Sequence, residues 1–327
     1  MWRAKVSAFF YFVVLFLPSE EKCAEDKVCV QMKTHGMLSA DCYNKNIRTF
    51  PQCLRSDVEI IELSYNRIRK ITKEELSRYR KLKMLYLADN LLTHMENSTF
   101  EDLSGLMSLD LSLNGISHLP PVVFHLPSLK RLYLSQNQNI NIIEVVEETK
   151  PITSPLETLD ISFNELETLP NFGVMPNLWL YNISGNNLVS MKLRDVAGFC
   201  NLKKLANSNF TAYFDDPCDC WNLQTWLEDR NVNFTKIRCD VKKESCPYTV
   251  SHEDLALYDS CLSHLEKVSQ KSSLIKIAIA VGVVIIVVLL IIVYLLYRYR
   301  KNKKAKLKQE KRIEALINGK KELDGLL

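Results

Sequence analysis

The chain contains 327 residues, of which 47% are hydrophobic and 24% are charged, and its formal net charge is +4. Eleven basic and four acidic residues fall in the last 30 positions, so this tail carries +7 and the rest of the chain −3, and the basic balance is no indication of nucleic-acid binding. The six histidines are dispersed, and the sequence has no H-E-x-x-H, no G-x-S-x-G and no glycine-rich phosphate loop, so we expect no enzyme and no catalytic, cofactor or metal site.

Residues 1–19 have the pattern of a secretory signal peptide. Arg3 and Lys5 precede an apolar run from Val6 to Leu17, which is too short to span a bilayer. We therefore expect cleavage near Ser19, with an uncleaved anchor as the alternative.

Ten cysteines fall into two clusters of even size, one on each side of the central part of the chain. Even counts in a chain with a secretory signal favour disulfide bonds, with zinc sites as the alternative. The clusters are Cys23, Cys29, Cys42 and Cys53 in an N-terminal segment (residues 20–57), then Cys200, Cys218, Cys220, Cys239, Cys246 and Cys261.

Residues 58–210 repeat the template L-x-x-L-x-L-x-x-N-x-L. Successive copies start 24, 24, 23, 27 and 22 residues apart, which is the period of leucine-rich repeats. A seventh copy begins at Leu202 and Leu205 and then degrades, with Asn207 where an apolar residue belongs. The six complete copies start at Val58, Leu82, Leu106, Leu129, Leu156 and Leu178.

The template predicts an α/β solenoid, a leucine-rich repeat horseshoe with a parallel concave sheet. Its leucines lie on the inward-facing side of a short strand. Because a single coil buries too little apolar surface to be stable, the coils must stack. The asparagine at position 9 is expected to bond the backbones of neighbouring coils. Apolar residues further along each coil are expected to fill the convex side: Ile71, Met95, Phe100, Leu119, Phe124, Leu169 and Met191.

Positions 3 and 5 of each strand are expected to face outward on the concave side, because side chains alternate along a strand. In the first four strands these positions carry tyrosine, methionine and arginine between acidic residues, which is typical of protein-binding surfaces. An ordinary solvated sheet is the alternative. The residues predicted to bind a protein are Glu62, Met84, Tyr86, Asp110, Arg131 and Tyr133.

Two other features of the repeats leave alternatives open. His94 and His118 occupy the same template position in adjacent coils and should stack, either as solvated convex-side residues or as a metal- or pH-sensing pair. The fourth repeat has an insertion from Val145 to Pro155, expected as a loop at the edge that contacts a partner or is merely tolerated.

A solenoid exposes apolar core at both ends, and the cysteine clusters are expected to cap it. The segments DCYNKNIRTFP (Asp41 to Pro51) and DPCDCWNLQTWLEDRNVNFTKIRC (Asp216 to Cys239) resemble the caps of extracellular leucine-rich repeat proteins. The resemblance covers about residues 42–227 and places the C-terminal cap at residues 211–265.

This resemblance implies further features of the caps. Trp221 and Trp226 would lie over the last coil, on a capping helix, with a role in binding as the alternative. The additional Cys53 departs from the family pattern, so the N-terminal connectivity is left open. The implied C-terminal pairs are Cys218–Cys239 and Cys220–Cys261, which leave Cys200 and Cys246 for each other.

Four N-x-S/T sequons predict N-glycosylation, at Asn97, Asn182, Asn209 and Asn233. Asn182 stands at position 5 of the sixth strand, whereas the other three are expected outside the strand positions. Because a bulky glycan excludes a protein from its neighbourhood, the expected binding site shifts toward the first four strands.

Residues 277–297 carry no charge and would form about 31 Å of helix, enough to cross a hydrocarbon core of about 30 Å. They follow a juxtamembrane segment (residues 266–276). Nine Lys and Arg between Arg298 and Arg312 place the tail (residues 298–327) in the cytoplasm, where it contacts anionic lipid or serves only as an anchor. Ala278 and Gly282 could support a homodimer, and residues 322–327 resemble an acidic dileucine sorting signal.

The tail is too short for an enzymatic signalling domain. By resemblance, we expect a plasma-membrane protein whose extracellular solenoid is a recognition or adhesion receptor for an extracellular or cell-surface protein. The alternatives are an accessory subunit that modulates a channel or another receptor in the same membrane, and an innate immune recognition receptor.

Overall fold

The structure, a computed structural model, describes residues 29–209 and 211–324, so the expected signal peptide and Cys23 lie outside the described residues. The chain divides after Leu265 into two compact units, which are described separately. The strands are β1 (Val30–Thr34), β2 (Met37–Asp41), β3 (Ile60–Glu62), β4 (Met84–Tyr86), β5 (Ser108–Asp110), β6 (Arg131–Tyr133), β7 (Thr158–Asp160), β8 (Leu180–Asn182), β9 (Asn187–Leu188), β10 (Lys204–Ala206), β11 (Thr211–Ala212) and β12 (Asn233–Phe234). The α-helices are α1 (Lys73–Leu76), α2 (Ile142–Thr149), α3 (Arg194–Ala197), α4 (Asp219–Asp229) and α5 (His252–Asp324), and the 3-10 helices are η2 (Pro121–His125) and η3 (Lys243–Ser245).

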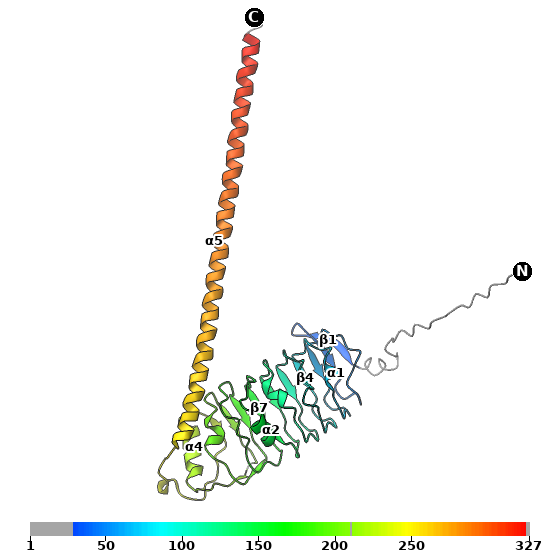
Figure 1. Ribbon diagram of the computed structural model, residues 1–327, viewed down its shortest axis with the longest axis vertical. Coiled ribbons are helices and arrows are strands. Elements are labelled where there is room, and N and C mark those ends of the chain that lie inside the picture. The colour runs from blue at the N-terminus through cyan, green and yellow to red at the C-terminus, as the bar shows by residue number, and fades with distance from the viewer. Residues whose placement is uncertain (1–28, 210, 325–327) are drawn as a thin grey trace, which may run out of the picture. The chain divides into compact units, whose positions relative to one another are not determined.

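One ten-stranded sheet runs through the first unit, in the order β1-β2-β3-β4-β5-β6-β7-β8-β10-β12 (Figure 1). β1 pairs with β2 in the antiparallel sense, and the later pairings of this sheet are parallel. The predicted parallel sheet is therefore confirmed. Each complete repeat contributes one strand of three residues with a buried centre: Ile61, Leu85, Leu109, Leu132, Leu159 and Tyr181.

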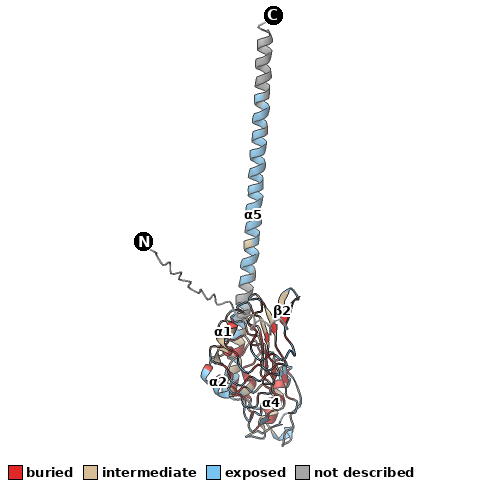
Figure 2. Ribbon diagram, turned by 90° about the vertical axis from the view of Figure 1, so that its right-hand side faces the viewer, coloured by how far each residue is buried: buried red, intermediate tan, exposed pale blue. Residues whose placement is uncertain are grey.

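The strand leucines and the apolar residues on the opposite side of the coils form one continuous core. Met95 is 1% exposed, and Phe100 and Phe124 are fully buried, as predicted for the convex side. Figure 2 colours the buried residues red, and they recur along the coils of the first unit. Each buried Leu or Phe side chain stabilises the fold by about 1.5–3 kcal/mol, and because each coil is covered by its neighbours, the stack is stable where one coil is not.

The six template asparagines join each coil to the preceding one. Asn137 is fully buried, accepts a 3.1 Å hydrogen bond from the backbone N–H of Ile116 and donates one of 3.0 Å to the carbonyl oxygen of Leu111. Corresponding bonds to the preceding coil recur at the other five asparagines. These side chains satisfy backbone groups that have no partner in the sheet, as the template predicted.

The residue before each template asparagine has a left-handed backbone, which the template did not predict. φ is 59° at Tyr65, 54° at Leu113 and 54° at Phe163, values that residues other than glycine and asparagine rarely adopt. The ring of Phe163 lies over Gly185, where a Cβ atom would stand 2.2 Å from it. Gly185, with φ of 68°, is thus required both by its own backbone and by this ring.

The insertion in the fourth repeat begins as a helix, so the expected loop is wrong. α2 buries Val145, Val146 and Thr149 against the core. Its buried residues recur at helical spacing from Ile142. This spacing begins before Val145, so it is not apparent when the inserted residues are considered apart from the repeat that precedes them.

The degenerate seventh repeat still supplies a full strand. β10 pairs with β8 on one side and with β12 of the C-terminal cap on the other. Asn207 donates to the carbonyl oxygen of Thr235 and accepts from its N–H, both at 2.8 Å, so this polar residue replaces an apolar one where the cap begins. Trp226 is 2% exposed in the core, as predicted, whereas Trp221 is half-buried and donates from its indole N–H to Val241.

The disulfide bonds of the C-terminal cap differ from all three implied pairs. The pairing Cys218–Cys239, Cys220–Cys261 and Cys200–Cys246 is wrong. The structure contains Cys200–Cys261, Cys218–Cys246 and Cys220–Cys239.

The reason lies in how the cap helices pack. Cys261 is fully buried in the first turns of α5 and reaches the last coil at Cys200. Cys220, 1% exposed, lies on the inner side of α4, where the chain returns after β12. Gln224, one turn later, bonds the backbone of Ile237 in that returning segment. Sequence spacing does not encode which side of a helix faces which segment.

The N-terminal cap contains a disulfide between Cys29 and Cys42, at the two ends of the β1–β2 hairpin. Cys53 is also disulfide-bonded, and none of the described cysteines is free. The structure therefore agrees with disulfides rather than zinc sites.

The second unit consists of the helical residues of α5 beyond Leu265. Within the described part of the chain, Ile277–Gln309 is the helical segment long and apolar enough to cross a membrane, by length and composition. Its apolar residues are exposed, for example 60% at Ile277 and 62% at Tyr297. Figure 2 colours this part of α5 as exposed.

Candidate functional site

The six predicted binding residues come from four consecutive strands, and the parallel register brings them together on one face of the sheet. We call the surface formed by positions 3 and 5 of the strands the open sheet face. Position 5 gives the row Asp41, Glu62, Tyr86, Asp110, Tyr133, Asp160 and Asn182, and position 3 gives Ser39, Ile60, Met84, Ser108, Arg131, Thr158 and Leu180.

The acidic residues of position 5 have a structural role that the sequence did not reveal. One carboxylate oxygen accepts a hydrogen bond from the backbone N–H two residues later, at 2.8 Å for Glu62, 2.9 Å for Asp110 and 2.9 Å for Asp160. This bond fixes the side chain at the point where the strand ends. A tyrosine side chain cannot make this bond to the backbone N–H two residues later. The presence of the two tyrosines in the row is therefore explained by their packing and their exposure at the surface.

Position 3 is less uniform than expected. Ser108 is fully buried and Thr158 is 6% exposed, whereas the longer side chains of the row are half-buried. Arg131 points back over β5, with Nε 3.4 Å from the hydroxyl oxygen of Ser108. The hydroxyl of Tyr86 lies 3.4 Å from the sulfur of Met84. The predicted residues therefore touch one another as well as the solvent.

The open sheet face concentrates negative charge. Burial raises the pKa of Glu62, and the carboxylates of Asp41 and Asp110 raise it further. Burial likewise raises the pKa of Asp110, with a contribution from Asp160. None of the ion pairs among the described residues includes an acidic residue of the position-5 row. The acidic side chains thus influence one another's pKa, and no described Lys, Arg or His forms an ion pair with them.

Two of the four sequons lie on the open sheet face, at its C-terminal end. Asn182, in β8, donates from Nδ2 to a carboxylate oxygen of Asp160 at 2.9 Å. Asn233 begins β12 in register with Lys204 of β10, which in turn faces Leu180. The expectation that Asn233 lies outside the strands is wrong, because the cap adds a strand that the repeat template does not describe. Asn97 and Asn209 are exposed outside the strands, as expected.

His94 and His118 stack as predicted, with ring centroids 5.8 Å apart and an interplanar angle of 29°. His118 contacts Asn97 through Nε2 at 2.7 Å and Asn141 through Nδ1 at 3.2 Å. Within the described ranges, no group of three or more His, Cys, Asp or Glu could hold a metal ion. The contacts of His118 give the pair a role in joining adjacent coils.

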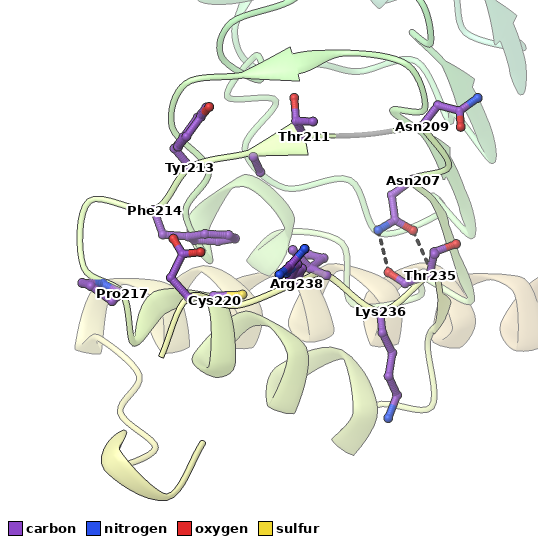
Figure 3. A pocket seen from close by; sticks show the side chains of 13 residues that line it. Asn207, Asn209, Thr211, Tyr213, Phe214, Pro217, Cys220, Thr235, Lys236 and Arg238 are labelled. Carbon is purple, nitrogen blue, oxygen red and sulfur yellow. Dashed lines mark hydrogen bonds between the residues drawn. The ribbon is translucent and has the colours of Figure 1, made fainter. Parts of the chain in front are cut away.

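A cavity of about 590 Å³ lies in the C-terminal cap, between residues 207–214 and the segment after β12 (Figure 3). Tyr213 and Arg238 line it from opposite sides, and the hydrogen bonds between Asn207 and Thr235 cross one end. The repeat template could not predict it, since most of its lining belongs to the cap. The sequon residue Asn209 also lines this cavity, so a glycan there would stand at its edge.

Comparisons with known proteins agree with the repeat architecture. A protein-family model described as "Leucine rich repeat" matches residues 80–138. The chain is 40% identical over 122 residues to human Toll-like receptor 8, 31% identical over 160 residues to chicken (Gallus gallus) Tsukushi, and 26% identical over 239 residues to human oligodendrocyte-myelin glycoprotein. These matches cover 35%, 48% and 68% of this chain.

The same matches cover 11%, 43% and 51% of the relatives' own lengths, so the chain spans about half of each relative or less. The family-model match, residues 80–138, falls on stacked coils in which template, register and asparagine bonds coincide. On this evidence residues 80–138 match the leucine-rich repeat model, and the coils on either side of them continue the same strand register.

Proposed function

We propose that this chain is a cell-surface recognition or adhesion receptor that binds an extracellular protein through the N-terminal half of its open sheet face. The observation that carries the proposal is the register of β4, β5 and β6. It places the half-buried Tyr86 and Tyr133 on either side of Asp110 in a surface without sequons. Large aromatic side chains at the centre of a surface are the residues that contribute most to protein binding.

The proposed topology follows from the second unit. Residues 277–297 cross the plasma membrane once, residues 298–327 lie in the cytoplasm, and the solenoid is extracellular. The length and apolar composition of this helix and the basic residues that follow it support this arrangement. The cap disulfides support an oxidising environment for the solenoid.

The test uses the full chain, purified in detergent, multimerised on fluorescent beads and applied to a panel of cell types. Tyr86→Ala or Tyr133→Ala should reduce binding to the stained cells at least tenfold, because truncation of such an anchor costs about 2 kcal/mol or more. Asn182→Gln should leave binding intact, since it removes a glycan at the far end of the face. Tyr213→Ala, which truncates an exposed tyrosine of the cap cavity, is the matched control.

Normal binding by both tyrosine variants would contradict the proposed site, and a loss with Tyr213→Ala would move the site to the cap. If no cell type is stained and the chain instead co-purifies with a channel or receptor from its own membrane, the accessory-subunit function replaces the one proposed here.

A further inference from the structure

Acidic and aromatic residues alternate along position 5 across five consecutive strands. From β3 to β7 the row reads Glu62, Tyr86, Asp110, Tyr133 and Asp160, each in direct register with the next. Neighbouring strands lie about 4.8 Å apart, so the Cα atoms of Tyr86 and Tyr133 are separated by about 9.6 Å with Asp110 between them.

This spacing leaves room for one cationic side chain between the two rings. A cation midway would lie within the roughly 6 Å of each ring that a cation–π contact requires. The carboxylate of Asp110 lies at the base of the gap, where it can accept charge-assisted hydrogen bonds from a guanidinium or ammonium group. Since one oxygen of Asp110 is already bonded to the N–H of Ser112, its orientation is set before a ligand arrives.

The electrostatics of the row favour the same kind of ligand. Burial and the neighbouring carboxylate of Asp160 raise the pKa of Asp110, so its charge is more costly than in water and an added cation would relieve that cost. Arg131 is the one cationic residue among the six predicted here. It stands at position 3, beside the gap, where it points to Ser108.

The spacing of the acidic residues also restricts the conformation of the ligand. Glu62, Asp110 and Asp160 occupy alternate strands, so their Cα atoms follow one another at about 9.6 Å. In an extended β-strand, side chains on one face recur about every 6.6 Å. In a polyproline II helix, with three residues per turn and a rise of 3.1 Å, they recur about every 9.3 Å, which matches the row.

Building on the function proposed above, we propose that the open sheet face binds a basic, proline-rich segment of its protein partner in the polyproline II conformation. The segment carries arginine or lysine at every third position. One of these side chains lies between Tyr86 and Tyr133 on Asp110, and its neighbours face Glu62 and Asp160.

The experiment measures binding of three fluorescent peptides of twelve residues to the full chain in detergent. The first is (Arg-Pro-Pro)4 and the third is (Glu-Pro-Pro)4. The second has the composition of the first, but its four arginines stand at every second position of the first seven residues (Arg-Pro-Arg-Pro-Arg-Pro-Arg) and five prolines follow. We expect the first to bind at least tenfold more tightly than the third and at least threefold more tightly than the second. Asp110→Ser should weaken the first at least fivefold, since serine keeps an oxygen acceptor for the N–H of Ser112 without the charge.

Two further variants test whether the sign of the removed charge and its position on the protein determine the effect on peptide binding. Arg131→Gln removes a cation beside the gap and should tighten the binding of (Arg-Pro-Pro)4. Asp229→Ser removes an exposed carboxylate at the end of α4 and should change nothing.

Preference for (Glu-Pro-Pro)4, equal binding of the two arginine peptides, or weaker binding in Arg131→Gln with no effect of Asp110→Ser would overturn the inference. The proposed function fails separately. If the tyrosine variants lose cell staining while the peptides do not respond to Asp110→Ser, the binding site stands and the chemistry of the partner is wrong.

Discussion

At the scale of single residues, the template asparagines connect the coils. Each amide accepts from one or two backbone N–H groups and donates to backbone carbonyl oxygens, and part of this bonding reaches the preceding coil, as at Asn137 with Ile116 and Leu111. A hydrophobic residue of the same size would fill the space and leave those groups without partners. The requirement is therefore chemical rather than steric, which is why asparagine recurs in all six complete copies.

Asn137→Ala should consequently destabilise the solenoid by about 1–3 kcal/mol for each buried backbone group left unpaired. Thermal unfolding of the full chain, followed by circular dichroism in detergent, would record this as a lower melting temperature. Asn139→Ala is the matched control, because this asparagine of the same coil is exposed. Equal melting temperatures for the two variants would mean that the asparagine bonds do not stabilise the stack.

At the scale of elements, the C-terminal cap depends on contacts between segments far apart in the sequence. α4 covers the last coil with Trp226, β12 extends the sheet, and the first turns of α5 are fastened to the last coil through Cys261. Three disulfides join α4, the first turns of α5 and the segments between them to one another and to the last coil, so the cap depends on their connectivity.

Cys220→Ser should destabilise the first unit by about 2–4 kcal/mol, the usual contribution of a disulfide. Because Cys220 pairs with Cys239, adding Cys239→Ser should cost little more. Combining Cys220→Ser with Cys261→Ser should instead add the loss of a second bond. Thermal unfolding of the single and double variants measures both, and additive losses for Cys220 with Cys239 would contradict the observed pairing.

The parts of the fold that could be predicted from sequence are those set by a repeated local pattern. The strands, the asparagine bonds and the convex core follow from a template in which every copy has the same neighbours. α2 was missed because it occurs once, and β12 because the cap strand has no template. The disulfide pairs were wrong because they depend on how α4 and α5 face the last coil, which is a tertiary property. In the candidate site, the rows were predictable from alternation, whereas the capping role of Asp110 was not.

Across the whole molecule, the open sheet face is divided between an acidic, aromatic N-terminal half and a C-terminal half that carries the sequons Asn182 and Asn233. The two halves have similar sequences where their strands end. Asp110-Leu111-Ser112 and Asn182-Ile183-Ser184 occupy the same template positions, and the first differs from a sequon in one functional group.

Asp110→Asn should therefore create a glycosylation site in the middle of the proposed binding surface. When the chain is made in a glycosylating host, we expect an added glycan by mass spectrometry and loss of cell staining. Enzymatic removal of the N-glycans converts a glycosylated asparagine to aspartate, which restores the original residue, so staining should return. Full staining with the glycan in place would show that the partner binds elsewhere.

The disulfide between Cys200 and Cys261 also imposes an order in time. Its partners are 61 residues apart in sequence, and the second lies shortly before the segment proposed to enter the membrane. Because the chain is synthesised from its N-terminus, all of its repeats have been made before Cys261 is added. Until then the disulfide that fastens the first turns of α5 over the last coil, beside Leu202 and Leu205, cannot form. Closure of the solenoid therefore comes only shortly before synthesis of the segment that we propose crosses the membrane, and a chain that ends before Cys261 keeps the apolar end of its last coil without this fastening.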